Sequence, residues 1–330
     1  MRRRTFLSSC IGSTASFYAL VSSEKRAAFL NKPGKEPNRS DAVVKVLGTV
    51  QDGGFPHFGC YCRNCRRARK EPSLSRFISS LAVCDFKEEK FFLLDATPDI
   101  RAQNDLICEW MGLSKKNTRR APDGVLLTHA HIGHYTGLIF FGYEAISTHR
   151  LPVYCSSRMK DFLEKNGPWS QLVTMENISI QPLELNKKIS LTPRISAAGF
   201  QVPHRDEYSD TLGFFLSGQK RSLLYIPDIR SWEAWERSVK EELRKVDIAL
   251  LDGTFYSPED LPGRDLSRIG HPFIQESLKT LHEAAREGRT EIYFTHLNHS
   301  NPTLDPDSRL RKKVEAQGFH IASDGMEFFL

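Results

Sequence analysis

The sequence lacks a long hydrophobic run and a large excess of charge of either sign. The mildly apolar stretch Cys10 to Val21 is too short and too polar to span a membrane, so we expect no stable membrane span. Of the net charge of +6, residues 1–28 contribute +4 through five basic residues and one acidic residue, which leaves +2 for the rest. We therefore expect no nucleic-acid partner.

Disulfides and short repeats are also missing as organising features. Four of the seven cysteines are scattered and three lie close together, which is not the spacing of a disulfide framework. No short-period repeat is visible. With 40% hydrophobic and 26% charged residues among 330, the composition indicates a globular protein of one large domain or two ordinary ones.

The first 28 residues predict an export signal. The run Arg3-Arg4-Thr5-Phe6-Leu7 precedes the mildly apolar stretch, which is the order of a twin-arginine signal and predicts a periplasmic protein. The alternative is the basic N-terminus of a cytoplasmic protein. Residues 29–42 carry few apolar groups, so we interpret them as a linker. Residues 43–330 are then one domain of alternating strands and helices.

Three histidines follow a short apolar run in the middle of the chain. Val125 to Leu127 predicts a buried strand, which stops at Thr128 and gives way to His129, His131 and His134. Neutral imidazole is a common ligand of zinc and iron, and this spacing places several imidazoles in one small volume. Chance crowding at a surface turn is the weaker explanation, because the chain has only 11 histidines. From Tyr135 to Ile146 we expect a helix.

Residues of metal-ligand type also follow other predicted strands. Functional groups gather where strands end in loops, so this distribution predicts a metal site at the strand ends. Each residue also has a simpler explanation, because a loop histidine, a turn aspartate after proline or a histidine at a helix start needs no such role. The residues concerned are His204, Asp228, Asp252, His271 and His296.

Cys60-x-Cys62-x-x-Cys65 has the spacing of a metal-binding turn. Tight turns bring three thiolates onto one tetrahedral ion, and three thiolates on zinc more often build a structural clip than a catalytic site. Two histidines are candidates for the fourth ligand: His57, which is near in the sequence, and His299, which is distant. A redox pair or free thiols are the alternatives.

The histidine run resembles the His-x-His-x-Asp-His signature of the metallo-β-lactamase superfamily, with Gly133 in place of the aspartate. The resemblance implies an α/β fold, an αβ/βα sandwich of two mixed sheets with helices on the outer faces. It implies a first metal held by His129, His131, His204 and Asp228, and a second position formed by His134, Asp228 and His296. His271, after Gly270, matches a proton donor of some members, and Asp252 matches an acidic supporting position. The Cys-rich clip of related members is closed by the second histidine of a His-x-x-His, which is His299 here.

Gly133 removes one carboxylate from the second position. Two divalent ions would then share Asp228 as their only protein carboxylate, and their mutual repulsion would be poorly compensated. We expect one tightly held metal and a weak or empty second position. Asp206 and Glu207 are the candidates to replace the missing group.

Longer strings resemble a narrower family, that of coenzyme PQQ synthesis protein B. The resemblance covers nearly all of Val46 to Leu330 and includes Gly53-Gly54-Phe55-Pro56 and Asn301-Pro302-Thr303-Leu304-Asp305. That family has largely lost the His-x-His pattern and the aspartate equivalent to Asp228, and this chain keeps both.

Three functions follow from these patterns. The first is a hydrolase in which a metal-bound hydroxide attacks an ester or phosphodiester of a small molecule, with His271, Asp228 and Asp252 as the acid–base and supporting groups. We expect Zn²⁺ in the clip and in the active site, with Fe²⁺ or Mn²⁺ as alternatives in the latter. The second is an iron-dependent oxygenase-type step of pyrroloquinoline quinone biosynthesis. The third is a carrier that binds a metal or ligand without catalysis.

Overall fold

The computed structural model describes residues 25–27, 29–30, 38 and 41–330. The predicted export signal over residues 1–28 and the predicted linker over residues 29–42 lie largely outside the described residues. Within the described part of the chain, no helix is both long and apolar enough to cross a membrane.

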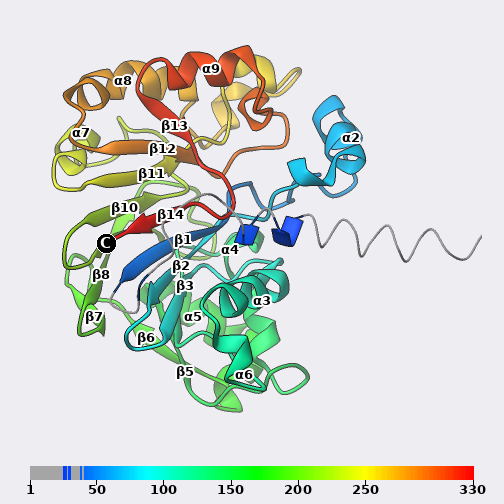
Figure 1. Ribbon diagram of the computed structural model, residues 1–330, viewed down its shortest axis with the longest axis vertical. Coiled ribbons are helices and arrows are strands. Elements are labelled where there is room, and N and C mark those ends of the chain that lie inside the picture. Colours follow the sequence, from blue (N-terminus) through cyan, green and yellow to red (C-terminus); the bar gives the residue numbers. More distant parts are fainter. Residues whose placement is uncertain (1–24, 28, 31–37, 39–40) are drawn as a thin grey trace, which may run out of the picture.

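Two seven-stranded sheets form the centre of the protein (Figure 1). The first sheet has the order β14 (Glu327–Phe329), β1 (Ala42–Gly48), β2 (Ser80–Asp85), β3 (Lys90–Leu94), β4 (Gly124–Leu126), β5 (Leu151–Cys155) and β6 (Ile178–Pro182). The second has the order β13 (Phe319–Ile321), β12 (Glu291–Thr295), β11 (Ile248–Asp252), β10 (Ser222–Ile226), β9 (Thr211–Ser217), β8 (Ile195–Val202) and β7 (Ile189–Thr192).

Both sheets are mixed, and the parallel strands of each sheet have their carboxyl ends at the same edge. Strands β3 to β6 run parallel to one another in the first sheet. In the second sheet β10 to β13 are parallel, and β9 is antiparallel to both β8 and β10, so β8 runs in the same direction as β10. The carboxyl ends of these strands therefore lie at one edge of each sheet, where ligands of layered α/β proteins usually bind.

Helices cover the outer face of each sheet, so the layers are helix, sheet, sheet and helix. Figure 1 shows α3 (Ile100–Trp110), α5 (Ser157–Lys165) and α6 (Trp169–Thr174) beside the first sheet, and α7 (Val239–Leu243), α8 (Ile274–Glu287) and α9 (Arg309–Glu315) beside the second. Two further helices are α2 (Arg63–Lys70) and α4 (Ile132–Tyr135). The short 3₁₀ segments are η1 (Pro72–Leu74), η2 (Leu113–Lys115), η3 (Thr136–Phe141), η4 (Pro258–Asp260), η5 (Leu266–Arg268) and η6 (Pro302–Leu304).

Burial on both faces explains the composition of the strands. β11, with the sequence IALLD, is buried throughout and reads as a continuous apolar run, as expected for a sheet covered on both sides. Alternate side chains belong to different layers: Leu250 packs between the two sheets, whereas Leu251 packs under the helices of the second sheet. The predicted sandwich with helices on its outer faces is confirmed.

The predicted helix from Tyr135 to Ile146 is wrong. The chain forms the one-turn helix α4 and then the 3₁₀ segment η3, which ends at Phe141. Gly137 lies so close to the carbonyl oxygens of Ala96 and Thr97 that a side chain there would overlap with them. This close approach holds the segment against the loop after β3, and the following residues form turns instead of continuing the helix.

Candidate metal centre

The predicted site residues meet at the carboxyl ends of the strands. His129 follows β4, His204 follows β8, Asp228 follows β10 and His296 follows β12. Asp252 is the last residue of β11, and His271 lies just before α8. The two sheets thus contribute to one cluster, which we call the His/Asp cluster and define by His129, His131, His134, His204, Asp228, Asp252, His271 and His296.

Three histidines form the first group within the cluster. One ring nitrogen from each of His129, His131 and His204 lies within 4.8 Å of the others, as ligands of a shared metal ion would. Nε2 of His129 faces Nδ1 of His131 at 2.8 Å, and Oδ1 of Asp228 lies 3.5 Å from Nε2 of His204. These are the four residues predicted for the first metal.

The second group surrounds the other oxygen of Asp228. Its Oδ2 lies 3.2 Å from Nε2 of His134 and 3.2 Å from Nε2 of His296, and these two nitrogens are 3.3 Å apart. The structure therefore brings together the three residues predicted for the second position. His296 has a positive φ of 58°, a backbone conformation that costs energy for a non-glycine residue and is common at functional sites.

Asp95 fixes the orientation of His134, and sequence reasoning missed it. Its Oδ2 accepts a hydrogen bond from Nδ1 of His134 at 2.7 Å, and its Oδ1 accepts one from the Thr128 backbone N–H at 2.8 Å. With the proton on Nδ1, the lone pair of Nε2 points into the second group, as in the carboxylate–histidine pairs of metal sites. Asp95 directly follows β3, so the strand-end rule that found the other residues applies to it as well.

The residues of the cluster fit a divalent metal ion. Both ring nitrogens of His204 and Oδ2 of Asp228 are buried and have no hydrogen-bond partner among the described residues. Such atoms are rare, because each costs about 1–3 kcal/mol when it is buried without a partner. Imidazole and carboxylate groups that converge in this way are the donor set that zinc, iron or manganese would use.

Electrostatics keeps several of these groups ready to bind a cation. Burial lowers the pKa of His129 well below its ordinary value and lowers that of His204 to about 4, so both rings are neutral near pH 7. Burial would raise the pKa of Asp228, but the electrostatic attraction of the neighbouring His296 ring, with smaller contributions from the other histidines, holds it well below its ordinary value. Neutral imidazoles and an ionised carboxylate are the forms that coordinate metals.

His271 and Asp252 form a pair beside the first group. Oδ2 of Asp252 lies 2.8 Å from Nδ1 of His271, while its Oδ1 accepts hydrogen bonds from the Thr254 N–H at 2.9 Å and the Thr254 hydroxyl at 2.8 Å. Burial would lower the pKa of His271, but the charge and the hydrogen bond of Asp252 outweigh it and raise that pKa. The pair is arranged to hold a proton next to the cluster.

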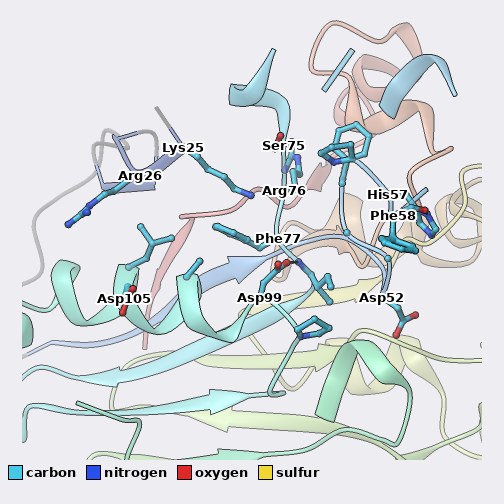
Figure 2. Close-up of a pocket in the computed structure, with 18 of the residues that line it drawn as sticks. Lys25, Arg26, Asp52, His57, Phe58, Ser75, Arg76, Phe77, Asp99 and Asp105 are labelled. Atoms are coloured by element: carbon cyan, nitrogen blue, oxygen red, sulfur yellow. Dashed lines mark hydrogen bonds between the residues drawn. The ribbon is translucent and has the colours of Figure 1, made fainter. Parts of the chain in front are cut away.

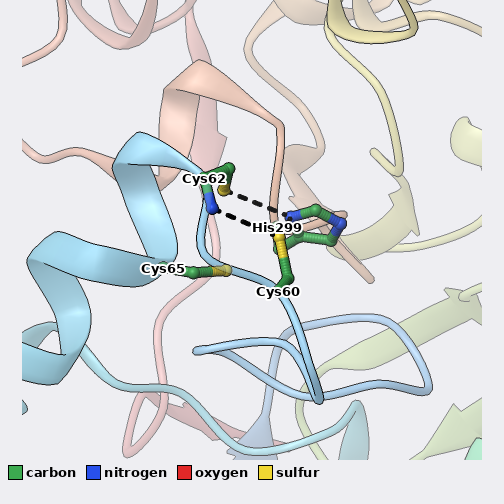
Figure 3. Close-up of side chains that lie close together, drawn as sticks. All are labelled: Cys60, Cys62, Cys65 and His299. Atoms are coloured by element: carbon green, nitrogen blue, oxygen red, sulfur yellow. Dashed lines mark hydrogen bonds between the residues drawn. The ribbon is translucent and has the colours of Figure 1, made fainter.

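A second candidate metal site lies outside the cluster. The donor atoms of Cys60, Cys62, Cys65 and His299 all lie within 4.8 Å of one another, and Nδ1 of His299 is 3.6 Å from the sulfurs of Cys60 and Cys62 (Figure 3). The alternative ligand His57 is not in this group, because its Nδ1 lies 2.8 Å from the Phe58 carbonyl. We call the four grouped residues the cysteine clip.

The helix α2 and one arginine shape the clip. Cys62 is the N-cap of α2 and Cys65 lies in its first turn, so the Cys-x-x-Cys spacing follows from one turn of helix. The Cys62 backbone N–H donates to the Cys60 sulfur and lowers the pKa of that thiol. Arg69 donates to the carbonyls of His57 and Cys65 and anchors the loop.

Asp52 lines two cavities. The first, of about 480 Å³, is lined by His271, Asp52 and His299 together with Arg205, Arg264 and Arg268. A larger cavity of about 1010 Å³, shown in Figure 2, lies on the other side of Asp52 and is mostly apolar. His271 lines the smaller of these two cavities, whereas no residue of the His/Asp cluster lines the larger one.

The structure does not place the predicted replacements for the missing aspartate beside Gly133. Asp206 accepts a hydrogen bond from the Thr211 hydroxyl at 3.2 Å, and Glu207 lies 3.4 Å from Nε2 of His131. Instead Asp52 contacts Gly133, since its Oδ1 accepts the Gly133 N–H at 2.7 Å. Sequence reasoning missed Asp52.

Comparison with known proteins identifies the family. Residues 90–297 match the family described as Beta-lactamase superfamily domain. Coenzyme PQQ synthesis protein B of Stutzerimonas stutzeri is 28% identical over 315 residues, which cover 87% of this chain and 99% of that protein.

Two solved structures have a similar fold. The crystal structure of Zn(2+)-bound PqqB from Methylobacterium extorquens superposes with a TM-score of 0.73 at 24% identity, covering 87% of this chain and 100% of that chain. A diphosphatase from the PhnP family superposes with a TM-score of 0.62 at 21% identity, covering 88% and 97%. The family match spans more than half of the chain, so the protein belongs to the beta-lactamase superfamily.

Proposed function

We propose that the protein is a metal-dependent hydrolase of a small anionic ester, with a phosphodiester as the favoured class. The observation that carries this proposal is the convergence of five histidines and Asp228 next to the His271–Asp252 pair, with both ring nitrogens of His204 and Oδ2 of Asp228 left without a hydrogen-bond partner among the described residues. Membership of the beta-lactamase superfamily and the similar fold of a diphosphatase from the PhnP family support it.

The His/Asp cluster would hold the metal through His129, His131, His204 and Asp228. A divalent ion bound there would supply a water of pKa about 7 and would polarise the substrate oxygen. The protein itself keeps the imidazoles neutral and the carboxylate ionised, and it holds these donors rigidly. Their burial, and the hydrogen bond between Thr128 and Nδ1 of His129 at 2.9 Å, serve this purpose.

His271 is placed to give a proton to the leaving group. Its Nδ1 is engaged by Asp252, which leaves Nε2 to exchange a proton with a substrate in the smaller cavity. Asp252 is itself fixed by Thr254 and by the Ile229 N–H, so the His271 ring cannot turn away without losing its contact with a firmly held carboxylate.

Arginines favour an anionic substrate. Arg205, Arg264 and Arg268 line the smaller cavity, and Arg205 and Arg268 also border an adjoining cavity of about 470 Å³ together with Arg230. Guanidinium groups near a metal site bind phosphate or carboxylate oxygens well.

A second candidate function is a step in pyrroloquinoline quinone synthesis. It is favoured by the similarity to coenzyme PQQ synthesis protein B, which extends over 99% of that protein's length. If this candidate holds, the cluster would use Fe²⁺ and the reaction would consume oxygen, whereas a hydrolase needs neither.

The test compares hydrolysis with oxygen use. The metal-free protein is loaded separately with Zn²⁺, Mn²⁺ or, without air, Fe²⁺, and is given bis(p-nitrophenyl) phosphate, p-nitrophenyl phosphate or p-nitrophenyl acetate. We expect metal-dependent release of p-nitrophenol from the diester, lost on chelation and lost in His131→Ala. Absence of release with every metal, together with iron-dependent oxygen uptake, would replace the hydrolase by the second candidate. A metal bound without turnover of any kind would instead identify a carrier.

A further inference from the structure

Gly133 has no side chain because Asp52 fills the space that one would take. A Cβ atom built on Gly133 would lie 2.5 Å from Oδ1 and 2.9 Å from Cα of Asp52, both shorter than real contacts. The backbone of Gly133 is helical within α4, so its conformation does not require glycine. The carboxylate that the sequence pattern lacks at position 133 is therefore present in space, delivered by another part of the chain.

The loop that carries Asp52 is held on both sides. Its neighbour Gln51 donates its backbone N–H to the Leu297 carbonyl at 3.1 Å, and the Gln51 side chain accepts from Asn298 at 2.5 Å. These contacts fasten the loop to the segment directly after His296. The hydrogen bond from Gly133 to Asp52 fastens it to α4, directly before His134. Asp52 thus bridges the two elements that supply the histidines of the second group.

One oxygen of Asp52 is left for a ligand. Oδ1 accepts the Gly133 N–H, while Oδ2 has no hydrogen-bond partner among the described residues. Asp52 is half-buried and lines both cavities. Figure 2 shows it at the edge of the larger one. A carboxylate with one fixed and one available oxygen is well suited to bind a cation through the second oxygen.

We propose that Asp52 replaces the aspartate missing at position 133, and that Asp52, His134, Asp228 and His296 form a second divalent-cation position. This inference rests on the proposed metal-dependent function and goes beyond it by assigning a second ion. It reverses the sequence-based expectation of a weak or empty second position. Two carboxylates, Asp52 and Asp228, then offset the repulsion between two divalent ions, where Asp228 alone would offset much less.

Metal content of defined variants tests the proposal. Each protein is equilibrated with Zn²⁺, freed of unbound metal and analysed by mass spectrometry for ions per chain. We expect about three ions in the wild type, one in the cysteine clip and two in the His/Asp cluster. Asp52→Asn keeps the shape and the acceptor for the Gly133 N–H but loses the charge, and we expect it to bind about two. Asp206→Asn, the matched control, should keep about three.

An exchange variant supplies the decisive comparison. Asp52→Gly combined with Gly133→Asp removes the carboxyl group that occupies most of the space and returns a carboxylate to position 133. The loop backbone must also move slightly, because a Cβ at position 133 would lie 2.9 Å from the Cα of residue 52. We expect about three ions again, which a merely structural role of Asp52 would not restore. Thermal unfolding of the metal-free variants shows whether each one folds. If Asp52→Asn does not fold, the metal content of the exchange variant tests the proposal.

Three outcomes would overturn the proposal: two ions in the wild type, three in a folded Asp52→Asn, or two in a folded exchange variant. Failure of the proposed function has a different signature. In that case His131→Ala would bind as many ions as the wild type, because no ion would occupy the cluster at all.

Discussion

Replacing Asp95 with asparagine should weaken metal binding at the position of His134 without disturbing the fold. Asp95 has a positive φ of 68°, a conformation that asparagine adopts as readily as aspartate. An asparagine oxygen can still accept the Thr128 N–H. The amide nitrogen then takes the place of Oδ2 and presents N–H groups to Nδ1 of His134. The ring must respond by carrying its proton on Nε2, where a metal would bind.

The size of the effect follows from this change of tautomer. Removing a carboxylate that orients a metal-binding histidine costs about 10–100-fold in metal affinity. This equals about 1.4–2.8 kcal/mol, since each tenfold change in affinity is about 1.4 kcal/mol. The group of His129, His131 and His204 does not contact Asp95 directly, so its affinity should change little.

Titration with Zn²⁺ in competition with a coloured chelator measures the affinities of the separate positions. Asp123→Asn is a suitable control, because Asp123 also accepts a backbone N–H, that of Phe91 at 3.0 Å, and has no histidine partner. We expect wild-type affinities in the control and one weakened position in Asp95→Asn. Unchanged affinities in a folded Asp95→Asn would refute the reasoning, and so would equal weakening of every position.

Three further predictions address the clip, the proton donor and acid stability. Cys62→Ala should lose one zinc ion per chain and unfold at a lower temperature while cluster metal is retained; unchanged metal content would contradict the clip. His271→Ala should lower kcat about 10²–10⁴-fold with cluster metal still bound, and a full rate would remove His271 from the mechanism. Asp85 pairs with Arg194 in the protein interior. Asp85→Asn should therefore lower the free energy of unfolding by about 3–5 kcal/mol near pH 7. Burial would raise the pKa of Asp85, but the hydrogen bonds from Arg194 and Thr192 hold it below its ordinary value of 3.8.

The pH dependence of this last effect follows from the direction of the shift. A carboxyl whose pKa is lower in the folded state stabilises that state above its unfolded pKa and loses the contribution as the pH falls through the folded value. The difference in free energy of unfolding between wild type and Asp85→Asn, measured with urea, should therefore be full near pH 7 and shrink below about pH 4. A difference that stays constant down to pH 2 would contradict this account.

The strand-end residues could be read from the sequence because each one directly follows a short apolar run. His204, Asp228, Asp252 and His296 all obey this pattern, and parallel strands then bring them to one edge without further information. Asp95 also directly follows an apolar run, but in the sequence it cannot be told apart from the polar turn that follows β3.

Asp52 could not be found in this way. Its importance depends on Gly133, 81 residues away, and their contact exists only because the loop after β1 docks between α4 and the end of β12. The helix expected from Tyr135 to Ile146 failed for a similar reason, since the close approach of Gly137 to the loop after β3 is a tertiary contact. Local patterns predicted which residues carry the chemistry, and packing decided which of them meet.

Anomalous diffraction from crystals grown with Zn²⁺, recorded on both sides of the zinc absorption edge, tests the central claim most directly. The account predicts one peak bounded by Cys60, Cys62, Cys65 and His299, and further zinc density within bonding distance of His129, His131, His204 and Asp228. A peak in the clip with no zinc density in the His/Asp cluster would contradict it.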